Sequence, residues 1–295
     1  MNKGLVYVLS AYIFWGLHPI YWKMLSDVPA LMIVANRIIW SLLFFMIIII
    51  KRNELKNLLK KVKLAKITHY LIPSILIGLN WFGYVWAINN NFIIETSLGY
   101  YLSPFASVLL GVFILKEKLS LYKWFSILLA LFGVLIMIIY YGKIPYVALY
   151  LALTWSVYGY LRKESQFNSL EGLTVETGLL SFPSLLIISF FVTSPTVNSF
   201  SSLNITLLIL SGLISGLPLL VFISGSRLIN LSIIGIMQFL YSTMIFLLGY
   251  FVYNEPLSKA KLIGFLFIWS GLIVFSIEKY IKIIINNVFL NRQNS

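Results

Sequence analysis

The chain has 295 residues, of which 60% are hydrophobic and 11% are charged, and its formal net charge is +13. Soluble domains carry roughly a quarter charged residues, so this composition excludes an ordinary soluble protein, whose core could not hide so much apolar surface. The chain has no cysteine and only two histidines, which excludes disulfides and thiolate metal sites, and we expect no metal or other cofactor.

Apolar runs recur from one end of the chain to the other. Each is about 20 residues long, enough for a helix to cross a hydrocarbon core of about 30 Å. We therefore predict an all-α membrane protein with ten transmembrane helices. In chain order the predicted spans are Gly4–Tyr21, Ala30–Ile50, Tyr70–Asn89, Thr96–Leu115, Tyr122–Tyr141, Tyr146–Leu161, Gly172–Val192, Ile205–Ser226, Ile233–Val252 and Ala260–Ile277.

The lysines and arginines between the spans indicate how the chain is oriented. If the amino terminus faces the cytoplasm, the inner segments hold 17 basic residues and the outer loops hold 4. Because basic residues concentrate on the cytoplasmic side of membrane proteins, we predict that both termini are cytoplasmic. This topology explains the positive net charge without nucleic acid as a partner. The basic segment from Lys51 to His69 is interpreted as an anchor at the lipid surface, with a regulatory site as the alternative.

The stretch from Ser97 to Gly133 occurs twice in the chain. Placing Glu117 over Glu255, a shift of 138 residues, brings further pairs into register: Gly111 with Gly249, Leu119-Ser120 with Leu257-Ser258, and Gly133 with Gly271. A shift of 140 also places Trp15 over Trp155. A repeat at a fixed period indicates that the chain is a doubled unit.

This repeat predicts how the two halves lie in the membrane. Five spans separate each residue from its copy, so the halves must enter the bilayer in opposite directions, as in many secondary transporters. We predict two inverted five-helix repeats, 1–143 and 144–280, followed by a cytoplasmic tail, 281–295. Glu117 and Glu255 fall between helices, and we expect a structural role for them beside Leu-Ser pairs that cap the next helix.

Two charged residues lie deep inside predicted spans. Arg37 lies about seven residues into the second span, and Glu176 about five residues into the seventh, so each is roughly 10 Å deep from its own side. A charge at this depth is unfavourable and marks either a site or an ion pair that locks helices. We expect both to face a central cavity, on opposite sides of the midplane, with pairing inside the protein as the alternative.

Aromatic and polar residues near the middle of other spans are candidates for the same cavity. Trp15 and Trp155 are conspicuous, since tryptophan usually lies at the membrane interface. With them we place further candidates, for each of which simple packing is the alternative: Asn80, Trp81, Tyr101, Gln238 and Tyr241. His18, in the first span, is a candidate hydrogen-bond donor.

Several segments resemble a known family across almost the whole chain. These are WGLHPIYWK, NRIIWS, GLNWFGYVWAINN, ETSLGYYLSPFASVLLGVFILKEKLS and the second-half copy QFLYSTMIFLLGYFVYNEPLS. They resemble the EamA family of the drug/metabolite transporter superfamily, and within it the bacterial inner-membrane RarD group. The resemblance implies ten helices in two inverted repeats around a central cavity, alternating access, and export of metabolites or drugs. The RarD-like pattern has a histidine before the arginine of the second span, and Asn36 stands there instead, which argues against a proton role.

We therefore expect a transporter of the bacterial plasma membrane whose partners are a small organic solute and the lipid bilayer. The candidate charges would suit an amino-acid-like solute, while the oligomeric state is left open. One alternative is a membrane-embedded enzyme such as a lipid-modifying transferase, but the chain has no H-E-x-x-H motif and no phosphate-binding glycine loop. Another is a structural or sensory membrane protein.

Overall fold

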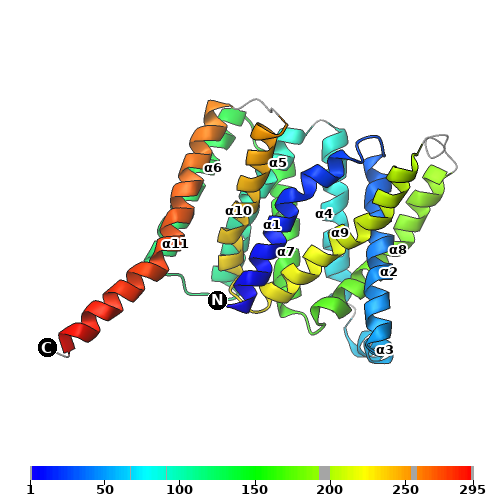
Figure 1. The fold of residues 1–295 in the computed structure, drawn as a ribbon, viewed down its shortest axis with the longest axis horizontal. Helices are drawn as coiled ribbons and strands as arrows, with labels where there is room; N and C mark the ends of the chain where they lie inside the picture. The colour runs from blue at the N-terminus through cyan, green and yellow to red at the C-terminus, as the bar shows by residue number, and fades with distance from the viewer. Residues whose placement is uncertain (1, 67, 91, 193–199, 254–257, 294–295) are drawn as a thin grey trace.

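A computed structural model of the chain describes residues 2–66, 68–90, 92–192, 200–253 and 258–293. Within these ranges the structure consists of helices joined by loops, without a strand. In chain order the helices are α1 Lys3–Lys23, α2 Ala30–Lys51, α3 Leu55–Leu64, α4 Thr68–Asn89, α5 Ile93–Leu109, the π-helix η1 Leu110–Ile114, α6 Leu121–Tyr141, α7 Tyr146–Glu164, α8 Ser169–Val192, α9 Ser202–Ser226, α10 Leu231–Phe251 and α11 Lys259–Gln293. The long helices run between the upper and lower faces of the molecule in Figure 1. The predicted all-α class is confirmed.

Nine of these helices are long and apolar enough to cross a membrane, so the chain is a multi-span membrane protein. A helix covers each of the ten predicted spans, but α7 is not among the nine. Its last turn holds Arg162, Lys163 and Glu164, and hydroxyl-bearing residues lower the hydropathy of the rest. Although it is less apolar than the other long helices, α7 is part of the bundle and packs against α4 and α5.

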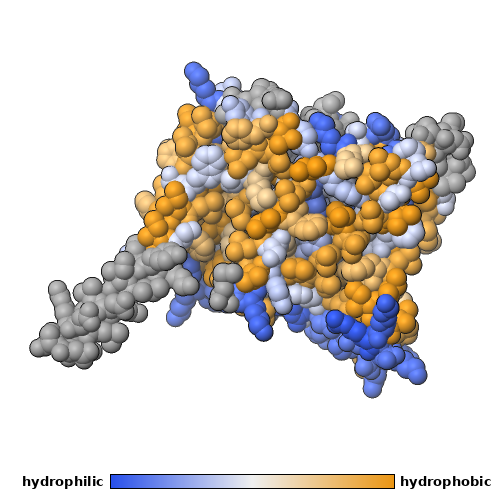
Figure 2. Space-filling view, in the orientation of Figure 1, coloured by the Kyte–Doolittle hydropathy of each residue, from blue (hydrophilic) through white to orange (hydrophobic). Residues whose placement is uncertain are grey.

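The outer surface of the bundle is apolar. The bulky side chains of Phe132, Phe182 and Phe190, for example, are 54%, 71% and 73% exposed. Figure 2 shows hydrophobic residues across the middle of the molecule and hydrophilic residues gathered toward its ends. A soluble monomer rarely exposes so large an apolar surface, whereas lipid tails cover it favourably.

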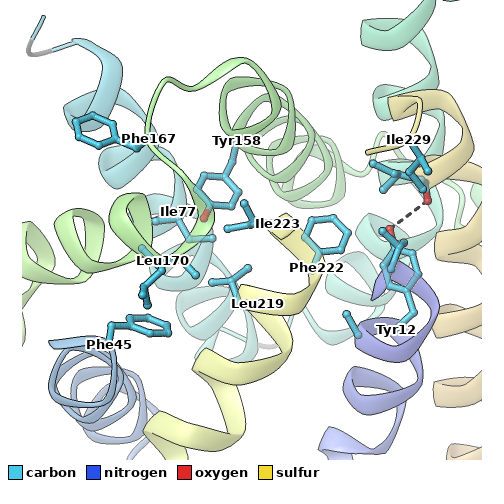
Figure 3. Close-up of a cluster of buried hydrophobic side chains, with 14 of the residues drawn as sticks. Tyr12, Phe45, Ile77, Tyr158, Phe167, Leu170, Leu219, Phe222, Ile223 and Ile229 are labelled. Carbon is cyan, nitrogen blue, oxygen red and sulfur yellow. Dashed lines mark hydrogen bonds between the residues drawn. The ribbon is translucent and has the colours of Figure 1, made fainter. Parts of the chain in front are cut away.

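The largest buried cluster joins helices from both halves of the chain. Figure 3 shows this cluster, in which Tyr12 of α1 contacts Phe222 of α9 and which also contains Phe45 of α2 and Tyr158 of α7. The Tyr12 hydroxyl also donates a hydrogen bond to the carbonyl of Ile234 in α10, at 3.1 Å. The two halves therefore share one core at the centre of the bundle.

Helices of the first half pack mainly against helices of the second. Helix α1 lies against α9 and α10, and correspondingly α7 lies against α4 and α5. Helix α2 contacts α9, and correspondingly α8 contacts α4. Three further pairs, α2 with α8, α5 with α10 and α6 with α11, complete the set. Exchanging each helix of the first five spans for its counterpart in the second five leaves this set of pairs unchanged.

Glycines let two of these helix pairs approach closely. A Cβ atom at Gly212 of α9 would overlap the backbone of Trp40 and Ser41 in α2. The Ser41 hydroxyl donates a hydrogen bond to the Gly212 carbonyl at 2.8 Å. Where α6 and α11 cross, a Cβ atom at Gly133 would overlap the carbonyl oxygen of Gly264. Small residues have this role in membranes because close backbone packing, and not the hydrophobic effect, holds helices together there.

The repeated glutamate Glu117 holds the start of α10. Its Oε1 accepts a hydrogen bond from the N–H of Leu231 at 2.7 Å, and its Oε2 accepts one from the N–H of Ser232 at 2.9 Å. A carboxylate at a helix amino terminus satisfies free N–H groups and complements the helix dipole. The structural role predicted for Glu117 is confirmed, whereas Glu255 lies outside the described residues.

The two serines that follow in the repeat begin helices, as predicted. The Ser120 hydroxyl accepts a hydrogen bond from the N–H of Lys123 at 3.4 Å, at the start of α6. The Ser258 hydroxyl accepts one from the N–H of Lys261 at 3.2 Å, at the start of α11. Both hydroxyls satisfy an N–H group that the first helical turn leaves free.

Two segments have more helix than the sequence predicted. The basic segment after α2 contains α3, whose Leu58 is buried while its lysines are exposed. The predicted tail 281–295 is helical as far as Gln293, because α11 continues past Ile277. No glycine or proline follows Gly271 to interrupt it.

Candidate substrate site

Arg37 of α2 lies among aromatic side chains. Its Cζ atom is 4.1 Å from the centre of the Trp81 ring in α4 and 5.9 Å from that of Trp22 in α1. The face of an indole ring attracts a cation, so these contacts stabilise the guanidinium. The Nε atom is buried and has no hydrogen-bond partner within the described ranges. Arg37 therefore keeps a donor that those residues do not use.

A row of aromatic rings leads from Arg37 across the bundle. Tyr84 lies one turn after Trp81 on α4, and its ring is 6.1 Å from that of Tyr100 in α5. The row then continues with centroid distances of 5.3 Å from Tyr100 to Tyr241, 6.5 Å from Tyr241 to Tyr12, 5.9 Å from Tyr12 to Trp15, and 5.6 Å from Trp15 to Trp155. These residues come from five helices of both halves, so the row crosses the interface between the halves.

Two further predicted site residues lie on the helices of this row. His18 of α1 contacts the Trp22 ring edge-on at 5.6 Å, and its Nε2 is 3.1 Å from the carbonyl oxygen of Ile214, which accepts the hydrogen bond. Gln238 precedes Tyr241 by one turn of α10 and is buried. Its Oε1 has no hydrogen-bond partner among the described residues.

Asn80 and Tyr101 lie in other contacts. The Asn80 amide donates to the carbonyl of Leu151 at 3.0 Å and to the hydroxyl of Thr154 at 2.8 Å, which links α4 to α7. The Tyr101 ring is buried edge-on against Phe265 of α11, at 5.4 Å. In this structure Asn80 joins helices, and Tyr101 packs in the cluster beside α6 and α11.

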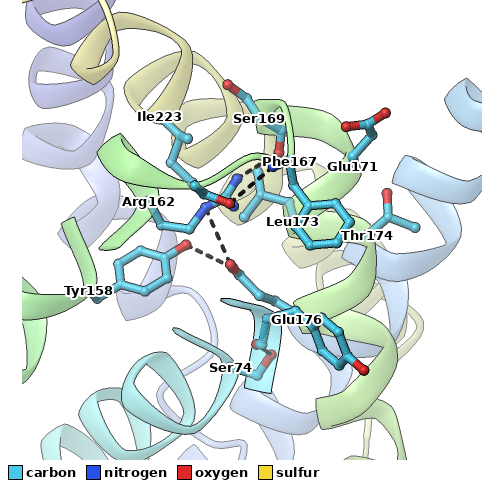
Figure 4. Close-up of polar contacts among 12 residues, drawn as sticks. Ser74, Tyr158, Arg162, Phe167, Ser169, Glu171, Leu173, Thr174, Glu176 and Ile223 are labelled. Carbon is cyan, nitrogen blue, oxygen red and sulfur yellow. Dashed lines mark hydrogen bonds and ion pairs between the residues drawn. The ribbon is translucent and has the colours of Figure 1, made fainter. Parts of the chain in front are cut away.

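Glu176 of α8 is held by other residues of the protein. One carboxylate oxygen is 3.3 Å from the Nε of Arg162 in α7, and the other accepts a hydrogen bond from the Tyr158 hydroxyl at 2.9 Å (Figure 4). This 3.3 Å contact is an ion pair and not a hydrogen bond, whereas the terminal nitrogens of Arg162 donate hydrogen bonds of 3.3 to 3.4 Å to Ser165 Oγ and to the carbonyls of Asn168 and Ser169. The Glu176 carboxylate is thus balanced by a cation inside the protein.

The burial of Arg162 was missed by the sequence reasoning, which placed this residue in an inner loop. Its side chain is only 1% exposed. Gly172 of α8 makes room for it, because a Cβ atom there would overlap the guanidinium. The available signal was Glu176 itself, since a carboxylate inside an apolar span needs a nearby cation, and Arg162 ends the preceding span.

The ion pairs lie away from Arg37. Three occur among the described side chains: Lys61–Glu171 at 2.7 Å, Arg162–Glu176 at 3.3 Å and Lys163–Glu117 at 4.0 Å. Within the same residues, no group of three or more His, Asp or Glu could hold a metal ion. Arg37 is therefore a cation inside a span without a carboxylate partner in the described part of the chain.

Comparisons with known proteins identify relatives of the chain. A model of the EamA-like transporter family matches residues 2–139. The uncharacterized transporter YojE of Bacillus subtilis is 40% identical over 94% of this chain and 95% of its own length. Protein RarD of Escherichia coli is 34% identical, again over 94% of this chain and 95% of its own length.

A solved structure, described only as the crystal structure of a protein, shares the fold. It has a TM-score of 0.72 and 17% sequence identity, and the match covers 94% of this chain and 97% of that one. Identity this low supports the fold and nothing about function. The full-length identity to RarD and to YojE, together with the family match, shows that this chain belongs to the EamA-like transporter family.

Proposed function

We propose that this protein is a secondary transporter that exports a small organic solute across the bacterial plasma membrane. The observation that carries the proposal is Arg37, a cation inside a span that contacts aromatic rings and has no carboxylate partner in the described residues. Such a residue is unfavourable in a membrane unless water, a partner or a solute reaches it. Relatives named as transporters support the same conclusion and argue against an enzyme.

The proposed architecture is ten spans in two inverted five-helix repeats, 1–143 and 144–280, with α7 as the sixth span. The set of helix pairs, which is unchanged when the halves are exchanged, supports this arrangement. Trp15 and Trp155, which a shift of 140 aligns, lie 5.6 Å apart. A residue and its copy can meet in this way only near the axis that relates the two halves.

The crossing of α6 and α11 supports the same axis. The repeat aligns Gly133 with Gly271, and Ser126 with Gly264, at a shift of 138. A Cβ atom at Gly133 would overlap the Gly264 carbonyl, and one at Gly271 would lie 2.6 Å from the Ser126 carbonyl oxygen. Each contact is thus the counterpart of the other. Alternating access follows if the two halves rock about this axis and expose the shared site first to one side and then to the other.

The proposed site is centred on Arg37 and the aromatic row. Its solute contacts are assigned to residues that the structure places in or beside that row: Arg37, Trp81, Tyr241, Trp15, Trp155, His18 and Gln238. Asn80, Tyr101 and Glu176 are assigned to the support of these helices, because each is engaged by protein groups.

Replacing Arg37 with Gln tests the function directly. The change removes the charge but keeps most of the volume of the side chain. We expect uptake into proteoliposomes to fall about 10- to 100-fold, because a hydrogen bond to a charged group contributes that factor to binding. Uptake is measured with a panel of radiolabelled organic acids, amines, amino acids and neutral drugs. Lys143→Gln, at an exposed loop residue, is the matched control and should leave uptake unchanged. An Arg37→Gln protein that inserts normally and transports at the original rate would contradict the proposal.

Cysteine labelling tests the proposed orientation, in which both termini are cytoplasmic. The chain has no cysteine, so Lys60→Cys in α3 and Lys143→Cys between α6 and α7 each introduce a single thiol. Both positions are exposed. In intact cells an impermeant maleimide should label the cysteine at position 143. It should label the cysteine at position 60 only after the membrane is permeabilised. The reverse pattern would show that the chain is oriented the other way.

A further inference from the structure

We infer that the transported solute is an organic monoanion with a flat, apolar body, bound through its anionic group to Arg37. This inference rests on the proposed function, since it names the class of solute for the same site. The inferred solute differs from the amino-acid-like solute expected from the sequence. Glu176 is paired with Arg162 inside the protein, so it does not offer a negative charge to the solute.

Arg37 is a buried cation without a counter-charge among the described residues. Its guanidinium lies over Trp81 at 4.1 Å, and its buried Nε has no hydrogen-bond partner within the described ranges. None of the three ion pairs in those ranges includes it. A buried cation without a counter-charge favours binding of an anion, and the planar fork of N–H donors matches a carboxylate.

The Glu176 carboxylate of α8 does not offer a second charge to the solute. An amino-acid-like zwitterion would need a free carboxylate for its ammonium group. The Glu176 carboxylate is not free, because Arg162 lies 3.3 Å away and the Tyr158 hydroxyl donates to it at 2.9 Å. Its side chain is 3% exposed. With this carboxylate already neutralised, the site presents one net positive charge, which a monoanion balances and a zwitterion does not.

The aromatic rings beside Arg37 indicate the shape of the rest of the solute. From Arg37 the protein presents the faces and edges of aromatic rings: Trp81, then Tyr84, Tyr100 and Tyr241. Aromatic rings pack well against flat apolar groups, in stacked or edge-to-face arrangements. An aromatic or similarly flat group attached to the anionic group therefore matches this lining better than a polar, sugar-like body.

The inference is tested with four probes that share a phenyl ring but differ in charge. These are phenylacetate, phenylacetamide, phenethylamine and phenylalanine, which at pH 7.5 are an anion, a neutral molecule, a cation and a zwitterion. Binding to the purified full-length protein is measured by isothermal titration. We expect phenylacetate to bind at least tenfold more tightly than the other three. Equal or tighter binding of another probe, or no binding of phenylacetate, would overturn the inference.

Variants of Arg37 make this test specific. Arg37→Gln should weaken phenylacetate binding about tenfold, to the level of phenylacetamide, and leave phenylacetamide itself unchanged. Arg37→Lys keeps the charge and should retain part of the preference. Lys143→Gln serves again as the control. A loss that is equal for all four probes in Arg37→Gln would mean that the residue supports the fold and does not select charge.

Flux measurements separate this inference from the proposed function. In proteoliposomes with a potassium gradient and valinomycin, an inside-positive potential should accelerate phenylacetate uptake at least twofold relative to zero potential. If phenylacetate binds with the expected preference but is never transported, the transporter function fails while the charge assignment stands. If phenylacetamide is transported as fast as phenylacetate, the transporter function stands and the inference of an anionic solute fails.

Discussion

Replacing Arg162 with Met is expected to lower the free energy of unfolding by about 3–5 kcal/mol, because it leaves a buried carboxylate without its counter-charge. The side chains of Arg162 and Glu176 are 1% and 3% exposed, so water cannot compensate for the loss. Glu176 would keep only the hydrogen bond from Tyr158. The measurement is unfolding of the purified protein in detergent, followed by tryptophan fluorescence.

A matched variant and a double variant show whether burial is the cause. Lys61→Met breaks a shorter ion pair, 2.7 Å, in which the Lys61 side chain is 50% exposed and the Glu171 side chain 6%. Water reaches this pair from the lysine side, and Glu171 keeps a hydrogen bond from the N–H of Asn168, so we expect a smaller loss of stability than for Arg162→Met. Combining Arg162→Met with Glu176→Leu removes both charges and should recover at least half of the lost stability. If Arg162→Met destabilises the protein no more than Lys61→Met, the Arg162–Glu176 pair is not a buried pair in the native protein.

Gly212→Val is expected to destabilise the protein by about 3 kcal/mol, because the new side chain must force α2 and α9 apart. Even a Cβ atom at this position would overlap the backbone of Trp40 and Ser41, which cannot move without the helix. The hydrogen bond from the Ser41 hydroxyl to the Gly212 carbonyl would also be lost. Melting temperature and the monodisperse fraction in size-exclusion chromatography report the effect.

A second glycine in the same bundle gives the control. A Cβ atom at Gly178 of α8 would meet only the Cδ1 of Leu42, at an ordinary 4.0 Å. Gly178→Ala should therefore be neutral, or stabilising by up to about 1 kcal/mol, because alanine favours the helix. Similar losses at both positions would indicate that glycine has a general role in this protein and that the close contact of α2 with α9 is not the cause.

The sequence was sufficient to predict the helices and one pair of equivalent positions in the two halves. Apolar runs of membrane length do not depend on tertiary contacts, so each predicted span corresponds to a helix. The alignment of Trp15 with Trp155 indicated a pair of equivalent positions, and the structure places their rings 5.6 Å apart. A structural role for Glu117 was predicted from its place between helices, but its partner was not, because the helix start that it holds lies 114 residues further along the chain.

The rest of the site could not be predicted because a sequence does not fix how each helix is rotated about its axis. Neighbouring residues differ by about 100° around a helix. Tyr101 was chosen as a candidate, but Tyr100 lies in the aromatic row while Tyr101 packs against Phe265. The burial of Arg162 was not predicted for a related reason. A cation at the end of a span is assigned to the loop unless the rotation and burial of that helix are known.

Helix α7 has 19 residues, and it is the one predicted span whose helix is not apolar enough to be counted among the nine membrane-crossing helices of the described residues. Its polar groups are matched by helices that precede it in the chain. Asn80 of α4 donates to the hydroxyl of Thr154 at 2.8 Å, and Ser107 of α5 donates to that of Ser156 at 3.1 Å. Ser156 in turn donates to the carbonyl of Ser103 in α5, at 3.1 Å.

This dependence has a consequence for biogenesis. A segment with little hydropathy of its own partitions weakly from the translocon into lipid, and interhelical hydrogen bonds can make up the difference. Since α4 and α5 are synthesised first, they are present in the membrane when α7 leaves the ribosome. We therefore expect the insertion of α7, as the proposed sixth span, and with it the orientation of every later helix, to depend on the earlier folding of the first half.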